Sequence, residues 1–199
     1  MDDDRLAQIH AFLGLCDRLK TIERGAYVSG QDRHENDAEH SWHMALFCLV
    51  LHRALGLTCD LGRVLEMVLC HDLVEILAGD VNVYDAAGRE AAKAREAQAA
   101  IDLFGPLPPP LDRHLTELWE EFEAGQTPEA QFAGAVDRLQ AMNQNYLTAG
   151  RGWREHGVTE AMSRRVNVVA AEACPALRPL FETIWDGAAA QGMWVEDET

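Results

Sequence analysis

The sequence predicts an all-α protein. Apolar residues recur at spacings of three and four along most of the chain, which is the pattern of amphipathic helices. The alternation of apolar and polar residues that marks half-buried strands is almost absent. The chain has 199 residues and contains no internal repeat, low-complexity tract or long linker. We therefore expect one domain over residues 1–199, large enough to bury its own core.

Helix-start signals and turn residues define the expected elements. Asn36 followed by Glu39 is a capping box, and Thr127 followed by Pro128 combines an N-cap with a proline at the first helical position. The polar, glycine-containing stretch 21–35 predicts a long loop. The expected helices cover, in chain order, about residues 6–19, 36–55, 61–77, 85–104, 111–124, 127–147, 159–174 and 176–190.

The most informative feature is the His71-Asp72 pair, which lies inside the most apolar of these helices, residues 61–77. This helix has Asp60 as its expected N-cap and is expected to end at Gly79. An ionised carboxylate in so apolar a segment is costly unless it is paired or bound to a cation. Asp72 therefore requires a partner.

Other side chains with suitable chemistry flank this pair. Glu75 follows it by one helical turn, Asp80 follows Gly79, and His40 lies near the start of the preceding helix. Asp137 is a carboxylate in an apolar stretch of a later helix. Two imidazoles and two carboxylates from three helices suit a divalent cation with water in its remaining positions. Taken singly, His40 could be a solvated histidine and Asp137 could form a surface ion pair with Arg138.

The net charge of the chain restricts the kinds of molecule that it can bind. The chain has 17 Lys and Arg against 33 Asp and Glu, which gives a net charge of −16 and a strongly acidic protein. Such a field repels nucleic acids and anionic membranes, so neither is an expected partner. A small phosphorylated substrate remains possible if a few arginines are held close to it. Arg24 and Arg33, in the stretch before the His40 helix, are the candidates.

The cysteines and the first residues indicate the cellular compartment of the protein. Five cysteines without a C-x-x-C pair argue against a disulfide framework and against a structural zinc site. The chain starts with the acidic run Met1-Asp2-Asp3-Asp4, where a signal peptide would be basic, and no apolar run is long enough to span a membrane. We expect a cytoplasmic protein.

The order of His40, His71-Asp72 and Asp137 resembles the HD-domain metal-dependent phosphohydrolases, whose pattern is H…HD…D on an all-α helical bundle. Within that superfamily, the chain looks like the group that contains the bacterial 5′-deoxynucleotidase and its eukaryotic HD-domain relatives. The segments that carry this closer resemblance are residues 35–43, 71–80 and 137–140, with Asn145-Tyr146. The resemblance covers about residues 19–157.

The resemblance implies a metal centre and a catalytic acid or base. His40, His71, Asp72 and Asp137 are implied to ligate one divalent ion, which could be Mn²⁺, Co²⁺, Fe²⁺, Ni²⁺ or Mg²⁺. Glu75 is implied to act on the attacking water, although it could instead hold a histidine in one tautomer. The implied reaction releases phosphate from nucleoside or deoxynucleoside 5′-monophosphates, and the implied assembly is a homodimer.

The resemblance also implies substrate contacts. Asp80 is implied to meet the sugar, and an arginine of the loop before the His40 helix is implied to hold the phosphate. Arg24 aligns best with that arginine, and Arg33 is the other candidate. The bacterial enzyme follows its arginine with a tryptophan thought to help select deoxyribose, whereas this chain has Gly25. The choice between ribose and deoxyribose stays open.

Three other functions fit parts of the same pattern. The protein could hydrolyse a signalling or cyclic nucleotide, since the metal site would look the same. It could be a non-catalytic HD module that binds a nucleotide, although Glu75 and Asp80 would then have no use. A di-iron HD oxygenase needs additional histidines between Asp72 and Asp137, and His114 alone lies in that interval.

Overall fold

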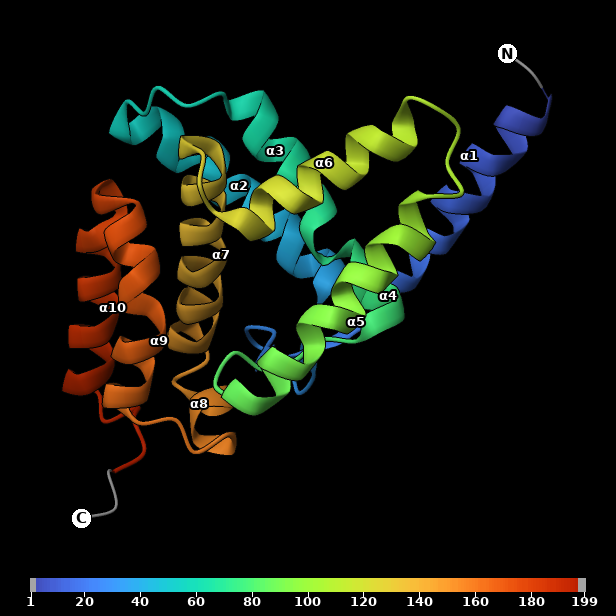
Figure 1. Ribbon diagram of the computed structural model, residues 1–199. Helices are drawn as coiled ribbons and strands as arrows, with labels where there is room; N and C mark the ends of the chain where they lie inside the picture. Colours follow the sequence, from blue (N-terminus) through green and yellow to red (C-terminus); the bar gives the residue numbers. More distant parts are fainter. Residues whose placement is uncertain (1–2, 197–199) are drawn as a thin grey trace.

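The computed structural model describes residues 3–196, and it confirms the all-α fold class (Figure 1). Met1 and Asp2 of the acidic start, and residues 197–199, lie outside the described part. The helices are α1 (Asp3–Cys16), α2 (Asp37–Leu55), α3 (Leu61–Cys70), α4 (Glu75–Ala78), α5 (Ala86–Phe104), α6 (Leu111–Ala124), α7 (Pro128–Leu147), α8 (Arg151–Glu155), α9 (Glu160–Ala173) and α10 (Arg178–Ala190). Short 3-10 turns are η1 (Asp17–Thr21), η2 (His71–Val74) and η3 (Pro175–Leu177), and the strands are β1 (Glu23–Tyr27) and β2 (His34–Asn36).

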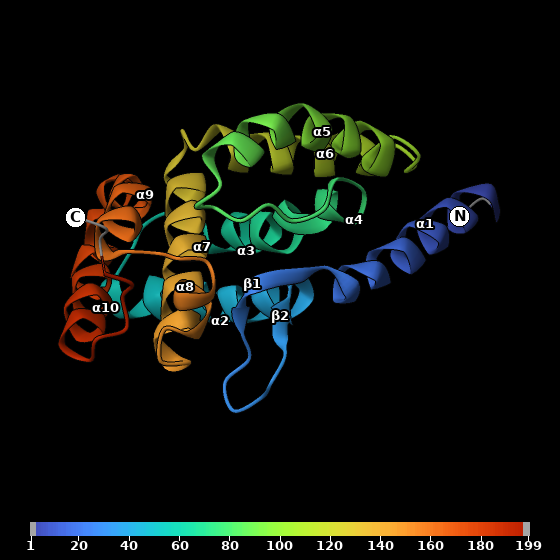
Figure 2. The same ribbon diagram turned by 90° about the horizontal axis from the view of Figure 1, so that it is seen from below.

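Helix α7 is the centre of the bundle. It packs against α2 and α3 on one side and against α9 and α10 on the other, while α5 and α6 form a further layer (Figures 1 and 2). Helix α1 projects away from the rest and buries none of its residues (Figure 2). Among residues 3–196, no helix combines the length and the apolar character needed to cross a bilayer.

Helix α3 belongs to two hydrophobic clusters at once. Val64 and Val68 pack into a cluster shared with α2, α7, α9 and α10, and Met67 and Cys70 pack into a second cluster shared with α4, α5 and α6. The chain that leaves α3 therefore enters the junction between the two clusters. The His71-Asp72 pair lies at this point, at the start of η2.

The expected caps at the starts of α2 and α7 are present. Asn36 Oδ1 accepts a hydrogen bond from the Glu39 amide at 3.0 Å, and a Glu39 carboxylate oxygen accepts one from the Asn36 amide at 3.1 Å. Thr127 Oγ1 accepts from the Ala130 amide at 3.2 Å, with Pro128 as the first helical residue. These caps determine where each helix begins, and thereby the direction of its later side chains.

The expectation of a loop over residues 21–35 was wrong. This stretch contains an antiparallel hairpin in which Glu23 pairs with Asn36 and Tyr27 with His34, with an irregular register between them. Side chains from the bundle hold it in place, because Gln144 Nε2 donates a hydrogen bond of 2.7 Å to the Tyr27 carbonyl. The strands are short and show no clean alternation, so the local sequence carries little strand signal.

The expected single helix over residues 61–77 was also wrong. The α-helix ends at Cys70, η2 follows over His71–Val74, and α4 ends at Gly79 as expected. In a continuous α-helix the Val68 carbonyl would accept from the Asp72 amide, but it accepts from His71 Nδ1 at 2.8 Å. The histidine side chain thus competes with the helix and favours the tighter turn at this position.

Candidate active site

Four side chains from three elements converge at the junction of the two clusters. His40 comes from α2, His71 and Asp72 from η2, and Asp137 from α7. His40 Nε2 lies 3.1 Å from Asp137 Oδ1 and 3.8 Å from Asp72 Oδ2. His71 Nε2 lies 3.1 Å from Asp72 Oδ1. The structure thus brings together the four residues expected to bind a metal.

Hydrogen bonds away from the cluster orient both imidazoles. Gln140 Nε2 donates to Glu35 Oε1 at 3.0 Å, so the Gln140 oxygen faces His40 and accepts from Nδ1 at 2.6 Å. His71 Nδ1 donates to the Val68 carbonyl. With each Nδ1 occupied, the Nε2 atoms of both histidines face the carboxylates. This is the arrangement in which a neutral imidazole binds a metal.

The donor set fits a divalent cation. His71 Nε2 is buried and has no hydrogen-bond partner within the described residues, which is costly for a polar atom. Donor atoms of His40, His71 and Asp72 all lie within 4.8 Å of one another. Burial lowers the pKa of His71, which keeps its ring neutral and able to act as a ligand. Mixed imidazole and carboxylate donors do not select one transition metal strongly.

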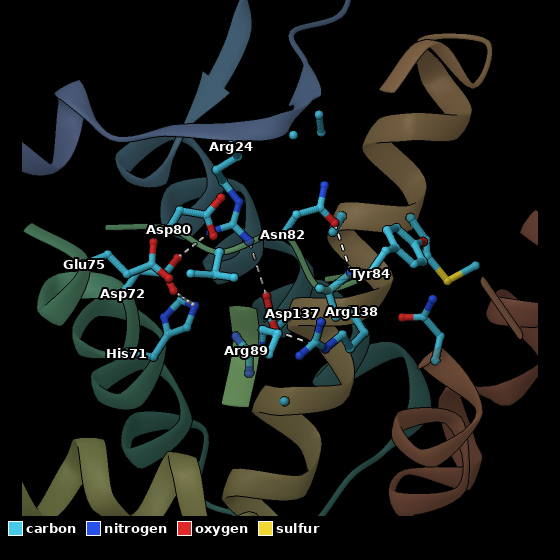
Figure 3. Close-up of a pocket in the computed structure, with 18 of the residues that line it drawn as sticks. Arg24, His71, Asp72, Glu75, Asp80, Asn82, Tyr84, Arg89, Asp137 and Arg138 are labelled. Carbon is cyan, nitrogen blue, oxygen red and sulfur yellow. Dashed lines mark hydrogen bonds and ion pairs between the residues drawn. The ribbon is translucent and has the colours of Figure 1, made fainter. Parts of the chain in front are cut away.

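Arg24 lies among the carboxylates rather than beside them. One of its terminal nitrogens is 2.9 Å from Asp37 Oδ1 and 2.9 Å from Asp72 Oδ2. The other is 4.0 Å from Asp137 Oδ1 (Figure 3). Burial lowers the pKa of Arg24, but the charges of Asp72, Asp80 and the other carboxylates raise it well above its ordinary value. Arg24 stays charged and balances the acidic cluster from within.

Glu75 and Asp37 form a second buried group of acids beside Asp72. Burial raises the pKa of Glu75 far above its usual range, and the charges of Asp72 and Asp37 raise it further. Burial and Asp72 also raise the pKa of Asp37, to about 6. A side-chain hydrogen bond joins the two, with the protonated Glu75 donating to Asp37, and this bond also raises the pKa of Glu75. Without a bound cation, Glu75 is therefore protonated at neutral pH.

A cavity of about 290 Å³ opens onto this cluster. Its polar lining includes Arg24, Asp72, Glu75, Asp80 and Asp137 (Figure 3). Aromatic and apolar side chains, among them Tyr84, Trp119, Phe122, Met142 and Trp153, also line it. A cavity that combines apolar walls with convergent polar and charged groups is typical of a site for a small molecule.

The arginines of the cavity differ from those expected. Arg24 lines it, but Arg33 lies outside and forms an exposed ion pair with Glu39, with a nitrogen–oxygen distance of 2.8 Å. Arg89 from α5 and Arg138 from α7 line the cavity and were not expected there (Figure 3). In the sequence Arg138 is an ordinary neighbour of Asp137, and nothing distinguishes Arg89 from the other charged residues of its helix.

Two smaller features of the sequence have clear positions. His156 lines the cavity and lies against Gly25, since a β-carbon on Gly25 would be 3.0 Å from His156 Nε2. His43 contacts Gln140 at 3.2 Å, and Trp42 is 64% exposed on the outside of α2. The space beside Gly25 is thus taken by side chains from other elements.

The sequence model of the HD domain matches residues 16–178 of the chain. The chain belongs to the HD-domain family. The match spans all four residues of the metal cluster, the hairpin with Arg24, and the cavity-lining helices α5 and α7.

Several relatives of this HD-domain protein have been described. The chain is 33% identical over 134 residues to 5′-deoxynucleotidase HDDC2 of Bos taurus, covering 67% of this chain and 64% of the relative. It is 28% identical over 141 residues to 5′-deoxynucleotidase HDDC2 of Dictyostelium discoideum, covering 68% and 74% of the two chains. The aligned region thus spans about two thirds of the bovine protein.

A solved structure resembles this HD-domain protein over nearly its whole length. It is described as a predicted metal-dependent phosphohydrolase from Magnetospirillum magnetotacticum and is 38% identical. The alignment covers 98% of this chain and 100% of the other, with a TM-score of 0.88. An HD-domain phosphohydrolase from Listeria innocua, 18% identical with a TM-score of 0.61 over 93% and 92% of the two chains, has the same fold.

Proposed function

We propose that this HD-domain protein is a metal-dependent phosphomonoesterase that releases phosphate from nucleoside and deoxynucleoside 5′-monophosphates. The observation that carries the proposal is the cluster of two oriented imidazoles and two carboxylates at a cavity, with the buried Glu75 beside it. The names of the bovine and Dictyostelium relatives support a 5′-monophosphate as substrate. The Magnetospirillum protein supports the reaction class.

His40, His71, Asp72 and Asp137 would hold the ion. A bound divalent ion lowers the pKa of a coordinated water and polarises a phosphoryl oxygen, and both effects favour hydrolysis of a phosphate ester. Gln140 and the Val68 carbonyl keep the two imidazoles in the required tautomer.

Glu75 and Asp80 are the residues we assign to the reaction. Glu75 is buried beside Asp37 and Asp72 and its pKa is raised, so its carboxylate would accept a proton readily from the attacking water. The water oxygen forms a new bond to phosphorus while the bond from phosphorus to the 5′ oxygen breaks. The proton taken up by Glu75 would then pass to the 5′ oxygen, so that the nucleoside leaves as the alcohol and Glu75 returns to its carboxylate. We assign to Asp80, which lines the cavity and whose charge acts on Arg24, the hydrogen bond from a sugar hydroxyl.

The finer features expected from the sequence remain proposals. They are a single metal ion for each chain, a cytoplasmic location, a homodimer, and one domain over residues 1–199. The choice of metal, base and sugar is equally a matter for experiment.

The proposal is tested by phosphate release from ribo- and deoxyribonucleoside 5′-, 3′- and cyclic monophosphates. The protein is stripped with a chelator and then resupplied with single divalent metals. Asp72→Ala should abolish release and weaken metal binding. Asp60→Ala is the matched control, because Asp60 caps the start of α3 and its loss costs about 1 kcal/mol without touching the site.

We expect metal-restored release that is confined to 5′-monophosphates and absent in Asp72→Ala. Release from cyclic or signalling nucleotides alone would replace the proposed substrate class. Metal binding without any release would leave a nucleotide-binding module and overturn the proposed enzyme.

A further inference from the structure

Arg24 reaches the cavity from strand β1 (Figure 3), at a point where the pairing of the hairpin is irregular. The regular pairs of β1 are at Glu23 and at Tyr27, and the register shifts between them. A shifted register leaves part of the backbone without a partner in the ladder. The direction in which Arg24 leaves the strand therefore depends on further contacts.

His34, on strand β2, provides the first of these contacts. Its Nδ1 lies 2.7 Å from the Arg24 carbonyl oxygen, and because a carbonyl can only accept, Nδ1 carries the proton and donates. The imidazole also packs against the ring of Tyr27, with the ring centroids 4.2 Å apart. Its Nε2 lies 3.9 Å from Glu155 of α8, which is too far for a hydrogen bond. Within residues 3–196, the bond to Arg24 is therefore the one hydrogen bond of the His34 side chain.

The backbone of α8 holds the next carbonyl of β1. A β-carbon on Gly152 would lie 2.5 Å from the Gly25 carbonyl oxygen, so the two backbones meet where no side chain fits. The carbonyls of Arg24 and Gly25 are thus held by His34 and by α8, and together these contacts fix the backbone that carries the Arg24 side chain. They do not involve the carboxylates of the metal cluster, so they do not depend on whether a cation occupies it.

Strand β2 supports the site at two neighbouring residues. His34 holds Arg24, and the next residue, Glu35, accepts a hydrogen bond from Gln140 at 3.0 Å. Gln140 in turn orients His40. The strand therefore places groups on both sides of the cluster without contributing a residue to it.

We propose that His34 is a positioning residue for the proposed reaction and acts by fixing the backbone that carries Arg24. This inference rests on the proposed function, in which Arg24 is the arginine expected to meet the phosphate. His34 lies outside the cavity, so its effect on the substrate passes through Arg24. The effect is large enough to measure, because a displacement of about 1 Å in a binding group can cost about 100-fold in rate.

Two polar substitutions separate the hydrogen bond from the other properties of the imidazole. The amide nitrogen of an asparagine can take the place of Nδ1, whereas that of a glutamine takes the place of Nε2. His34→Asn therefore keeps the donor to the Arg24 carbonyl, and His34→Gln loses it. His34→Ala removes the donor and the ring together. His34→Ala is also combined with Arg24→Lys, which keeps the charge that faces Asp37, to show whether the two residues act together.

The readouts are kcat and KM for phosphate release, the Kd of inorganic phosphate for the Mn²⁺-loaded protein by titration calorimetry, and Mn²⁺ affinity. We expect His34→Ala and His34→Gln to raise KM and the Kd of phosphate about tenfold, which corresponds to about 1.4 kcal/mol. Mn²⁺ affinity should stay unchanged, and kcat should fall less than KM rises. His34→Asn should stay close to the wild-type values. In the Arg24→Lys background, the effect of His34→Ala should shrink to at most about threefold, because the group that it positions is already altered.

Unchanged KM and phosphate binding in His34→Ala would overturn the inference. So would an equal loss in His34→Asn and His34→Gln, since the donor to Arg24 would then have no influence, or a full tenfold loss in the Arg24→Lys background. If the wild-type protein hydrolyses no monophosphate, the proposed function fails, and the Kd of inorganic phosphate in the same variants still tests His34. A wild-type protein that binds no phosphate would overturn the inference as well, because Arg24 would then have no phosphate to meet.

Discussion

Gln140 orients His40 without itself belonging to the cluster of His40, His71, Asp72 and Asp137. Its side chain is fully buried and contacts His40 Nδ1 at 2.6 Å, Glu35 Oε1 at 3.0 Å and His43 Nδ1 at 3.2 Å. Replacing Gln140 by Met keeps the approximate volume and removes these polar contacts. His40 is then no longer fixed in the tautomer that presents Nε2 to the cluster.

The expected magnitudes follow from these contacts. Gln140→Met leaves two buried groups, on His40 and Glu35, without a partner, at a cost of about 1–3 kcal/mol each and so about 2–6 kcal/mol in total. Loss of a group that orients a ligand lowers metal affinity by about 10–100-fold. Gln144→Met is the matched control. Gln144 is also a buried glutamine of α7, but its bond goes to the Tyr27 carbonyl and does not reach the cluster.

Two measurements separate these effects. Urea unfolding of the metal-free proteins gives the free energy of unfolding, and competition with a chelating dye gives the metal affinity. Gln144→Met should lose about 1–3 kcal/mol of stability with unchanged metal affinity. If Gln140→Met binds metal as tightly as Gln144→Met does, the role of Gln140 in orienting His40 is refuted.

Three further predictions concern single residues of the site and its surroundings. Glu75 keeps its proton in the folded, metal-free protein but loses it above its ordinary pKa of 4.5 when unfolded, so the contribution of Glu75 to the free energy of unfolding falls as pH rises. Glu75→Gln should remove this contribution, so that the free energy of unfolding falls less steeply by about 1.4 kcal/mol per pH unit between pH 5 and 7. If urea unfolding at several pH values gives the same slope for the variant as for the wild type, Glu75 ionises at its ordinary pKa. Gly25→Ala places a β-carbon 3.0 Å from His156 Nε2 and 3.1 Å from Asn82 Nδ2. The KM for the nucleotide should therefore rise while the metal affinity stays constant, and an unchanged KM would show that the substrate binds elsewhere. Arg33→Ala should leave phosphate release unchanged, because Arg33 is exposed and lies outside the cavity. A higher KM for the nucleotide in this variant would show that Arg33 contacts the substrate.

Local sequence signals were sufficient for most of the helices. The caps at Asn36 and Thr127 act between neighbours in the chain, so a short stretch of sequence contains both partners. The hairpin was missed because it depends on a hydrogen bond from the bundle as well as on its own strand pairing. The break after Cys70 was missed although its cause is local: the side chain of His71 binds the Val68 carbonyl three residues earlier, and the apolar pattern continues through this bond unchanged.

The same distinction applies to the site. The order of His40, His71-Asp72 and Asp137 identified the cluster, because residues of unusual chemistry in apolar helices stand out in a sequence. Asp37 did not stand out, since an acidic residue in the first turn of a helix is common, although it is fully buried here. The positions of Arg89 and Arg138 were missed for a related reason: the sequence does not show which of its many arginines face the cavity.

The distance in sequence between His40 and Asp137 has a consequence for the lifetime of the protein. These two residues are 97 positions apart and meet at 3.1 Å. A cation shared between them would tie the two halves of the folded chain together. Because the unfolded chain would release the ion, the gain in stability would depend on the free metal concentration, and it would be about 2.7 kcal/mol when that concentration is about 100 times the Kd. The abundance of this protein in a cell should therefore follow the supply of its metal, because molecules deprived of the ion unfold more often and are degraded sooner.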